Sequence, residues 1–199
     1  MEYRKNIMKN SLAENLRYLM QRKVFEKITI KQICDETGVI RATFYNYFED
    51  KYDCLNWIVH MDLSLADTHE DVKKDYSRFI LIALANIEKN KEFYKVAYNV
   101  VGQNGFEEII NNCYAESVLT FLNEKRDPDI LPQYSNELLS LYYGQTLAFI
   151  TKQFVFDKTN PSILETRKKA LDLMSHSIID YEKKGAVKLD EVIQKTVPK

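Results

Sequence analysis

The segment TIKQICDETGVIRATFYNYFEDK, residues 29–51, decides the fold of this chain. Its first half places apolar residues at the three- and four-residue spacing of one helix face, which predicts a short helix over 30–37. Thr29 stands directly before that pattern and is suited to cap the helix, because its hydroxyl accepts a hydrogen bond from a free amide of the first turn. Gly38 stands directly after it and is suited to end the helix in the left-handed conformation.

A second short helix is predicted after the glycine. Phe44 and Phe48 are four residues apart and therefore share a face, which we expect to be buried. The residues that fall largely on the other faces are Arg41, Ala42, Thr43, Tyr45 and Asn46. These side chains are expected at the surface, available to a partner. The alternative is that Tyr45 and its neighbour Tyr47 are ordinary half-buried helix residues.

Two flanking helices complete the pattern. Before the segment, Leu12, Leu16 and Leu19 form one apolar helix face, and after it Asp50 is suited to cap a long helix that begins near Lys51. Two short helices that are joined by a tight turn and packed on a preceding helix form a helix-turn-helix. In that arrangement the second helix lies in the major groove of DNA, with its outward side chains at base edges and phosphates.

Composition and charge agree with this interpretation. The chain has 199 residues, is 45% hydrophobic, and contains only 5 Gly and 4 Pro, which favours a helical protein of one domain or of a small module joined to a larger one. Residues 1–27 carry seven Lys and Arg against three Glu, a net charge of +4, so the remainder sums to −5. A basic start on a mildly acidic body is compatible with binding to nucleic acid.

The segment resembles the DNA-binding signature of the TetR family of bacterial transcriptional regulators. The shared features are the threonine-led helix, the Gly-Val turn, Thr-Phe-Tyr, and a lysine at the start of the next helix. The resemblance implies that Arg41 and Ala42 approach base edges, and that Asn46 faces the groove and reads adenine. It implies a contact to phosphate or base for Thr43, and phosphate contacts for Thr29, Tyr45, Tyr47 and Lys51. Ile40 stands where the family often has serine, which removes an expected helix cap.

The rest of the chain predicts further helices, so the expected fold is all-α. An N-terminal three-helix helix-turn-helix DNA-binding domain over 1–52 is followed by a helical effector-binding and dimerisation domain over 53–185 and a C-terminal tail over 186–199. The body resembles regulators related to the activator of dihydroxyacetone kinase operons, most clearly in FYKVAYNVVGQNGF. In the TetR family such a body usually holds a small-molecule pocket between its middle helices.

Aromatic residues of the middle helices are the candidates to line that pocket, because tyrosine combines an apolar ring with a polar tip. They are Phe79, Phe93, Tyr94, Tyr98, Phe106, Tyr114, Tyr142 and Phe149. The alternative is that they form plain hydrophobic core. The two long helices nearest the C-terminus, about 137–156 and 161–181, have wide apolar faces that are suited to pair with a second copy. The alternative there is that both faces close the core of the monomer.

The expected function is that of a homodimeric transcriptional regulator on a palindromic double-stranded DNA operator, modulated by a small-molecule effector or a protein co-regulator. Most members of the family repress, so repression is expected. Activation through a protein partner, and a helical ligand-binding module with a vestigial DNA-binding head, stay open as alternatives.

Other classes of function find little support. The sequence lacks a Gly-rich phosphate loop, GxSxG and HExxH, so no enzymatic activity and no cofactor are expected. Three cysteines without a CxxC, and histidines at 60, 69 and 176 that are far apart, predict no metal site. No apolar run has the length of a membrane span and no signal peptide is present, so a cytoplasmic location without membrane contact is expected.

Overall fold

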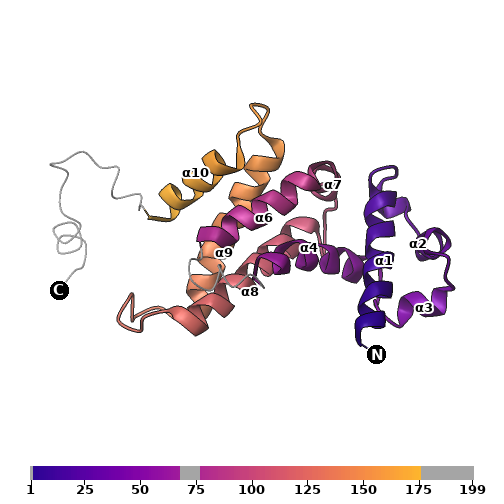
Figure 1. Ribbon diagram of the computed structural model, residues 1–199, viewed down its shortest axis with the longest axis horizontal. Coiled ribbons are helices and arrows are strands. Elements are labelled where there is room, and N and C mark those ends of the chain that lie inside the picture. Colours follow the sequence, from indigo (N-terminus) through magenta and orange to yellow (C-terminus); the bar gives the residue numbers. More distant parts are fainter. Residues whose placement is uncertain (1, 68–76, 176–199) are drawn as a thin grey trace, which may run out of the picture.

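The computed structural model describes residues 2–67 and 77–175, and every regular element within these ranges is a helix (Figure 1). The all-α expectation is therefore confirmed. The first helices form a small head at one end of the molecule, the longer ones form a larger body, and α4 reaches from the head into the body. None of the described helices combines the length and the apolar character needed to cross a membrane.

The head consists of α1 (Glu2–Met20), a 3-10 turn η1 (Phe25–Lys27), α2 (Ile30–Thr37) and α3 (Arg41–Tyr45). The predicted ends of α2 are confirmed. Thr29 caps the helix through a reciprocal pair of hydrogen bonds with Gln32, at 3.2 and 3.0 Å, and Gly38 closes it in the left-handed conformation with φ of 75°.

The helix α4 (Lys51–Asp67) joins the two parts of the molecule. Asp50 caps it as predicted, with its carboxylate accepting hydrogen bonds from the amides of Tyr52 and Asp53 at 2.7 and 2.9 Å. The same helix packs against α1 of the head and against α6 and α8 of the body. Its residues Leu55, Ile58 and Val59 are fully buried, because α4 has neighbours along much of its length.

The body continues with α6 (Ser77–Lys89), α7 (Lys91–Ala97), α8 (Phe106–Lys125), α9 (Asn136–Phe156) and α10 (Ile163–Ser175). The VGQNG turn separates α7 from α8, with positive φ at Gly102 and Asn104. Pro161 was expected to open the last helix, but Ser162 caps it instead, through hydrogen bonds exchanged with Glu165. The continuation that we expected beyond 175, the tail over 186–199, His69 and His176 lie outside the described residues.

The helices α8 and α9 form the closest pair in the body. A Cβ atom at Gly144 of α9 would lie 2.7 Å from the backbone nitrogen of Ala115 in α8 and 2.8 Å from its Cα. Only a residue without a side chain therefore permits this approach. The same two helices are also joined by a buried hydrogen bond of 2.7 Å between the hydroxyls of Tyr114 in α8 and Thr151 in α9.

The aromatic residues predicted to line one pocket separate into two groups. Six of them are buried and belong to the hydrophobic core, namely Phe79, Phe93, Tyr94, Tyr98, Phe106 and Tyr114. Phe106 stands at their centre, with ring centroids 6.5 Å from Phe93, 5.8 Å from Tyr94 and 4.9 Å from Tyr98. The other two, Tyr142 and Phe149, are 62% and 58% exposed on the outer face of α9. The eight side chains thus do not line one common cavity in this conformation.

Candidate nucleic-acid interface

The outer edge of α3 is the candidate interface, and the buried side of the same helix holds it in place. Phe44 is fully buried, Phe48 nearly so, and their rings lie 5.6 Å apart beneath α3. Val39 at the turn packs against the same core, and its amide bonds to the carbonyl of Cys34 at 3.0 Å. Since both ends of the turn are fixed, the outward direction of α3 is set by packing.

The predicted contact residues lie on this edge with graded exposure. Thr29, Arg41, Ala42, Tyr45 and Asn46 are exposed, whereas Thr43, Tyr47 and Lys51 are half-buried. The Arg41 guanidinium donates to the Tyr45 hydroxyl at 3.3 Å, one helical turn away, so the two side chains lie together on one surface. Tyr47 also packs against the core. Its half-buried position therefore fits both alternatives, a phosphate contact and an ordinary helix residue.

The start of α3 lacks a side-chain cap, as the sequence indicated. Ile40 occupies the cap position with the extended backbone that capping residues adopt, φ −84° and ψ 157°, but its side chain makes no hydrogen bond there. Its carbonyl accepts from the amide of Thr43 at 2.9 Å, and its side chain is 72% exposed. A large apolar side chain therefore stands exposed next to Arg41.

Lys51 has a structural contact that the sequence did not indicate. Its ammonium group donates to the carbonyls of Phe25, Glu26 and Ile28, at 2.8, 3.2 and 3.1 Å. Burial lowers the pKa of Lys51, and the charges of Glu26 and Asp50 offset part of that effect. An ammonium group has three protons, so a phosphate contact through this side chain requires that one of these bonds be given up.

Two basic residues near the interface were missed by the sequence reasoning. Lys27 and Lys31 are exposed and lie two residues to either side of Thr29, at the start of α2. The Lys31 ammonium lies 4.0 Å from the carboxylate of Asp35, which is a long ion pair. The signal that could have found them was their spacing around the capping threonine, because a helix N-terminus favours a nearby phosphate.

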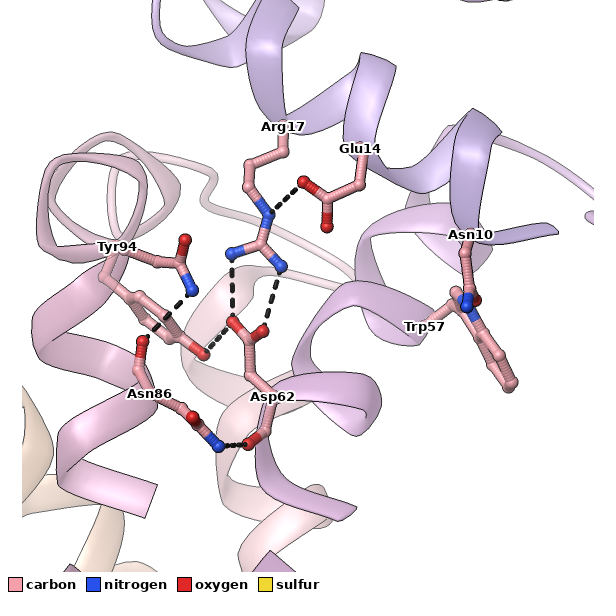
Figure 2. A network of polar contacts seen from close by, with 8 residues as sticks. Asn10, Glu14, Arg17, Trp57, Asp62, Asn86 and Tyr94 are labelled. Atoms are coloured by element: carbon pink, nitrogen blue, oxygen red, sulfur yellow. Dashed lines mark hydrogen bonds and ion pairs between the residues drawn. The ribbon is translucent and has the colours of Figure 1, made fainter. Parts of the chain in front are cut away.

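A buried polar network lies where the head meets the body. The guanidinium of Arg17 in α1 and the carboxylate of Asp62 in α4 form two hydrogen bonds, and the hydroxyl of Tyr94 in α7 donates to the same carboxylate (Figure 2). Arg17 and Asp62 were not among the predicted sites, and Tyr94 was predicted as a pocket residue instead. The available signal was a charge on an apolar helix face, since Arg17 follows Leu16 and Asp62 precedes Leu63.

No metal site accompanies the interface in the described part of the chain. Within residues 2–67 and 77–175, no three His, Cys, Asp or Glu side chains come close enough together to hold a metal ion. His60 instead lies 3.6 Å from the carboxylate of Glu116. The three cysteines are all free and buried. The site therefore consists of exposed arginine, hydroxyl and amide groups on a helix edge, the groups that contact bases and phosphates.

A head of this form defines the class of helix-turn-helix DNA-binding proteins. Residues 16–58 match the family model described as bacterial regulatory proteins, tetR family. The head of the chain is therefore similar to the DNA-binding domain of that family. The match covers the last turn of α1, all of α2 and α3, and the first half of α4.

Known proteins resemble the chain beyond the head. The HTH-type dhaKLM operon transcriptional activator DhaS of Lactococcus lactis subsp. lactis (strain IL1403) is 26% identical over 98 residues. That alignment spans 49% of this chain and 52% of the relative, so the chain matches about half of the relative's length.

Solved structures share the fold over most of the chain. The dihydroxyacetone kinase operon activator DhaS superposes with a TM-score of 0.61 and 20% identity, covering 89% of this chain and 99% of that one. The fatty acid degradation regulator FadR from Bacillus halodurans superposes with a TM-score of 0.59 and 14% identity, covering 84% and 94%. At these identities the likeness concerns the fold alone.

Proposed function

We propose that this chain binds a palindromic DNA operator as a homodimer and reads it with the outer edge of α3. The observation that carries the proposal is the division of α3, whose Phe44 is fully buried while Arg41 and Tyr45 are exposed. Arg41, Ala42 and Asn46 meet base edges, and the hydroxyls of Thr29, Thr43, Tyr45 and Tyr47 meet phosphates. We add Lys27 and Lys31 as phosphate contacts and keep Lys51 as a contact only if one of its carbonyl bonds is released.

The homodimer forms through α9 and α10. A row of large apolar side chains is exposed along α9, and two more are exposed on α10; the row consists of Leu138, Leu141, Tyr142, Phe149 and Phe156, and the two are Leu164 and Leu173. An exposed apolar face of this extent typically marks a protein interface. Two heads held one helical turn of DNA apart, roughly 34–36 Å, would match the half-sites of a palindrome.

An effector binds the body. Support comes from a hollow of about 350 Å³ between α8 and α9, which Tyr98 and Phe149 of the predicted set line together with Asn111 and Lys152. The hydroxyl of Tyr98 is buried and has no hydrogen-bond partner among the described residues. A buried hydroxyl without a partner is unfavourable, so a ligand that reached it would gain a hydrogen bond.

The regulator works in the cytoplasm, and repression is the mode expected for most of the family. The second candidate is activation. It is favoured by the likeness, in sequence and in fold, to DhaS, which is described as an activator of the dhaKLM or dihydroxyacetone kinase operon. A protein co-regulator would then take the place of a small effector.

Selection of bound sites from random duplex DNA with the purified protein tests the proposal. We expect enrichment of one palindrome, and repression or activation follows from placing that palindrome upstream of a reporter. If the folded protein enriches no sequence, with or without candidate effectors, the head is vestigial and the proposal fails.

The enriched palindrome then provides the probe for variants of the α3 edge. Arg41→Ala should weaken binding by about 1–3 kcal/mol and relax the preference at one base pair, the usual cost of losing a bidentate contact to guanine. Tyr45→Phe should weaken binding to all sequences alike, because a phosphate contact carries no base preference. Lys158→Ala, which removes one exposed charge from the loop between α9 and α10, is the matched control and should leave affinity within experimental error.

A further inference from the structure

Three helices of the body meet the first helix of the head at one buried residue, Asp62. Asp62 lies on α4, and its side chain accepts hydrogen bonds from Arg17 of α1 and Tyr94 of α7 (Figure 2). Its backbone carbonyl accepts from the amide of Asn86 on α6 at 2.8 Å. Asn90 extends this chain of contacts by donating to the carbonyl of Asn86 at 3.1 Å. One residue thus connects the head to α6 and α7 of the body.

The contact between Arg17 and Asp62 fixes direction as well as distance. Nη1 of Arg17 lies 3.1 Å from Oδ2 of Asp62, and Nη2 lies 2.9 Å from Oδ1, so the planar guanidinium and the planar carboxylate face each other edge to edge. Bidentate pairs of this kind restrict the relative orientation of their helices more than a single hydrogen bond does. The hydroxyl of Tyr94 in α7 donates to Oδ2 of the same carboxylate at 2.9 Å. The carboxylate is therefore bound by side chains from both α1 and α7.

The network is buried, which indicates that it serves to orient the helices that it joins. Arg17 and Asp62 are each only 5% exposed. Burial lowers the pKa of Arg17, but the hydrogen bonds and charge of Asp62 outweigh that effect and leave the pKa raised. Well-packed apolar residues often stabilise a fold as well as a buried ion pair does, so such a pair is better explained by the geometry that it specifies.

The same atoms connect to the aromatic core of the body. The guanidinium of Arg17 lies 4.8 Å from the ring centroid of Phe93, and the ring of Tyr94 packs edge-on against Phe93 and Phe106. Burial, and then the charge of Asp62, raise the pKa of Tyr94 well above its ordinary value, so its hydroxyl stays protonated and donates. The head is therefore in contact with the packed aromatic core of the body rather than with a loop.

We propose that Arg17, Asp62 and Tyr94 are positioning residues that fix the angle of the head on the body, and so set the half-site spacing that the dimer accepts. None of them lies on the α3 edge, and they act on DNA only through the direction in which that edge points. The inference rests on the proposed function, because it needs a dimer that reads two half-sites.

The test compares palindromes that differ only in the spacer between half-sites. The probes are the duplex enriched by selection and versions with the spacer shortened or lengthened by one and two base pairs. The main variant replaces Arg17 by Met and Asp62 by Leu together, which removes both charges and keeps apolar volume in the core. The conservative variant is Tyr94→Phe, which removes one hydroxyl. Affinities are measured at a temperature at which circular dichroism shows each variant folded.

We expect the wild type to bind the native spacing at least about tenfold more tightly than the altered ones, as a restraint worth one charge-assisted hydrogen bond would produce. The double variant should bind all spacings with similar affinity, and Tyr94→Phe should lie between. Both variants should bind a single half-site with the affinity of the wild type. A variant whose head had simply lost its structure would bind the single half-site more weakly.

Glu14→Gln is the matched control. Glu14 lies 3.4 Å from Nε of the same arginine, but it belongs to α1 itself, so its loss leaves the link between head and body in place. Its spacing preference should equal that of the wild type. If the folded double variant also keeps the wild-type preference, the positioning role is wrong. If the wild type itself enriches no palindrome or shows no spacing preference, the proposed dimeric function is what fails.

Discussion

The head and the body use the same aromatic residue types in different ways. In α3 and the turn after it, Tyr45 follows the buried Phe44, and Tyr47 precedes the buried Phe48. Both tyrosines reach the surface, and Tyr45 is half exposed. In the middle helices of the body, Phe93, Tyr94 and Phe106 are completely buried against one another. In the head a tyrosine side chain therefore reaches the surface, whereas in the body the hydroxyls of Tyr94 and Tyr114 form hydrogen bonds in the interior. Residue type alone does not separate a contact surface from a core.

The largest effect that tests this contrast is expected from the buried aromatic residues themselves. Phe44→Ala and Phe106→Ala should each lower the free energy of unfolding by about 3–5 kcal/mol, because each leaves a cavity in a fully packed site. Tyr45→Phe, on the exposed side of the same turn as Phe44, should change it by less than about 0.5 kcal/mol. Urea unfolding followed by circular dichroism measures all three.

An equal loss of stability in Phe44→Ala and Tyr45→Phe would contradict the division of α3 into a buried and a presented side. A small loss in Phe106→Ala would instead show that the aromatic centre of the body is loosely packed. In that case the body could open to hold a ligand among the six buried aromatic residues, as the sequence first suggested.

Most of the head could be predicted because local chemistry determines its boundaries. Thr29, Gly38 and Asp50 act within one helical turn of their own positions, so their residue types suffice to place the ends of α2 and the start of α4. In the body, the helix predicted over 137–156 agrees closely with α9. The fold class follows from these elements without knowledge of any long-range contact.

What could not be predicted depends on residues that are distant in sequence. Arg17 and Asp62 are 45 positions apart, and Tyr94 is a further 32 away, so no local pattern indicates that they meet. Lys51 illustrates a second limit, since a lysine at a helix start suggests a phosphate contact, yet the three carbonyls that bind its ammonium come from residues 25–28. Helical spacing correctly indicates that Phe44 and Phe48 face inward, but Tyr142 and Phe149, which were expected to line a pocket, are exposed. The spacing also does not reveal whether a cavity lies beside a buried aromatic residue.

The second prediction concerns the pair α8 and α9, where the body depends on a missing side chain. Alanine normally stabilises a helix by about 1 kcal/mol relative to glycine, but Gly144→Ala should destabilise the protein by about 1–3 kcal/mol because its methyl group would press on the backbone of Ala115. Thermal unfolding followed by circular dichroism measures the change. Gln145→Ala, on the exposed side of the next position, is the control and should change stability little. A more stable Gly144→Ala variant would show that the two helices can separate at small cost.

The smallest effect is expected at the start of α3, and it addresses whether the head is optimised for stability or for contact. Ile40 has the backbone of a capping residue and an exposed side chain that makes no cap. Ile40→Ser should therefore raise the free energy of unfolding by about 0.5–1 kcal/mol, because the serine hydroxyl can accept from a free amide of the first turn. Thr29→Ala, which removes the existing cap of α2, should lower it by about 1 kcal/mol. Urea unfolding of the two variants and their double combination measures both effects.

The same variant separates stability from recognition. If Ile40→Ser stabilises the head and leaves affinity for the enriched palindrome unchanged, the isoleucine is only an uncapped helix start. If it stabilises the head but weakens binding, the exposed side chain beside Arg41 contributes an apolar contact to DNA, such as one with a thymine methyl group. A loss of stability would contradict the cap argument itself, because Ile40 has little packing to lose and its backbone already has the capping conformation.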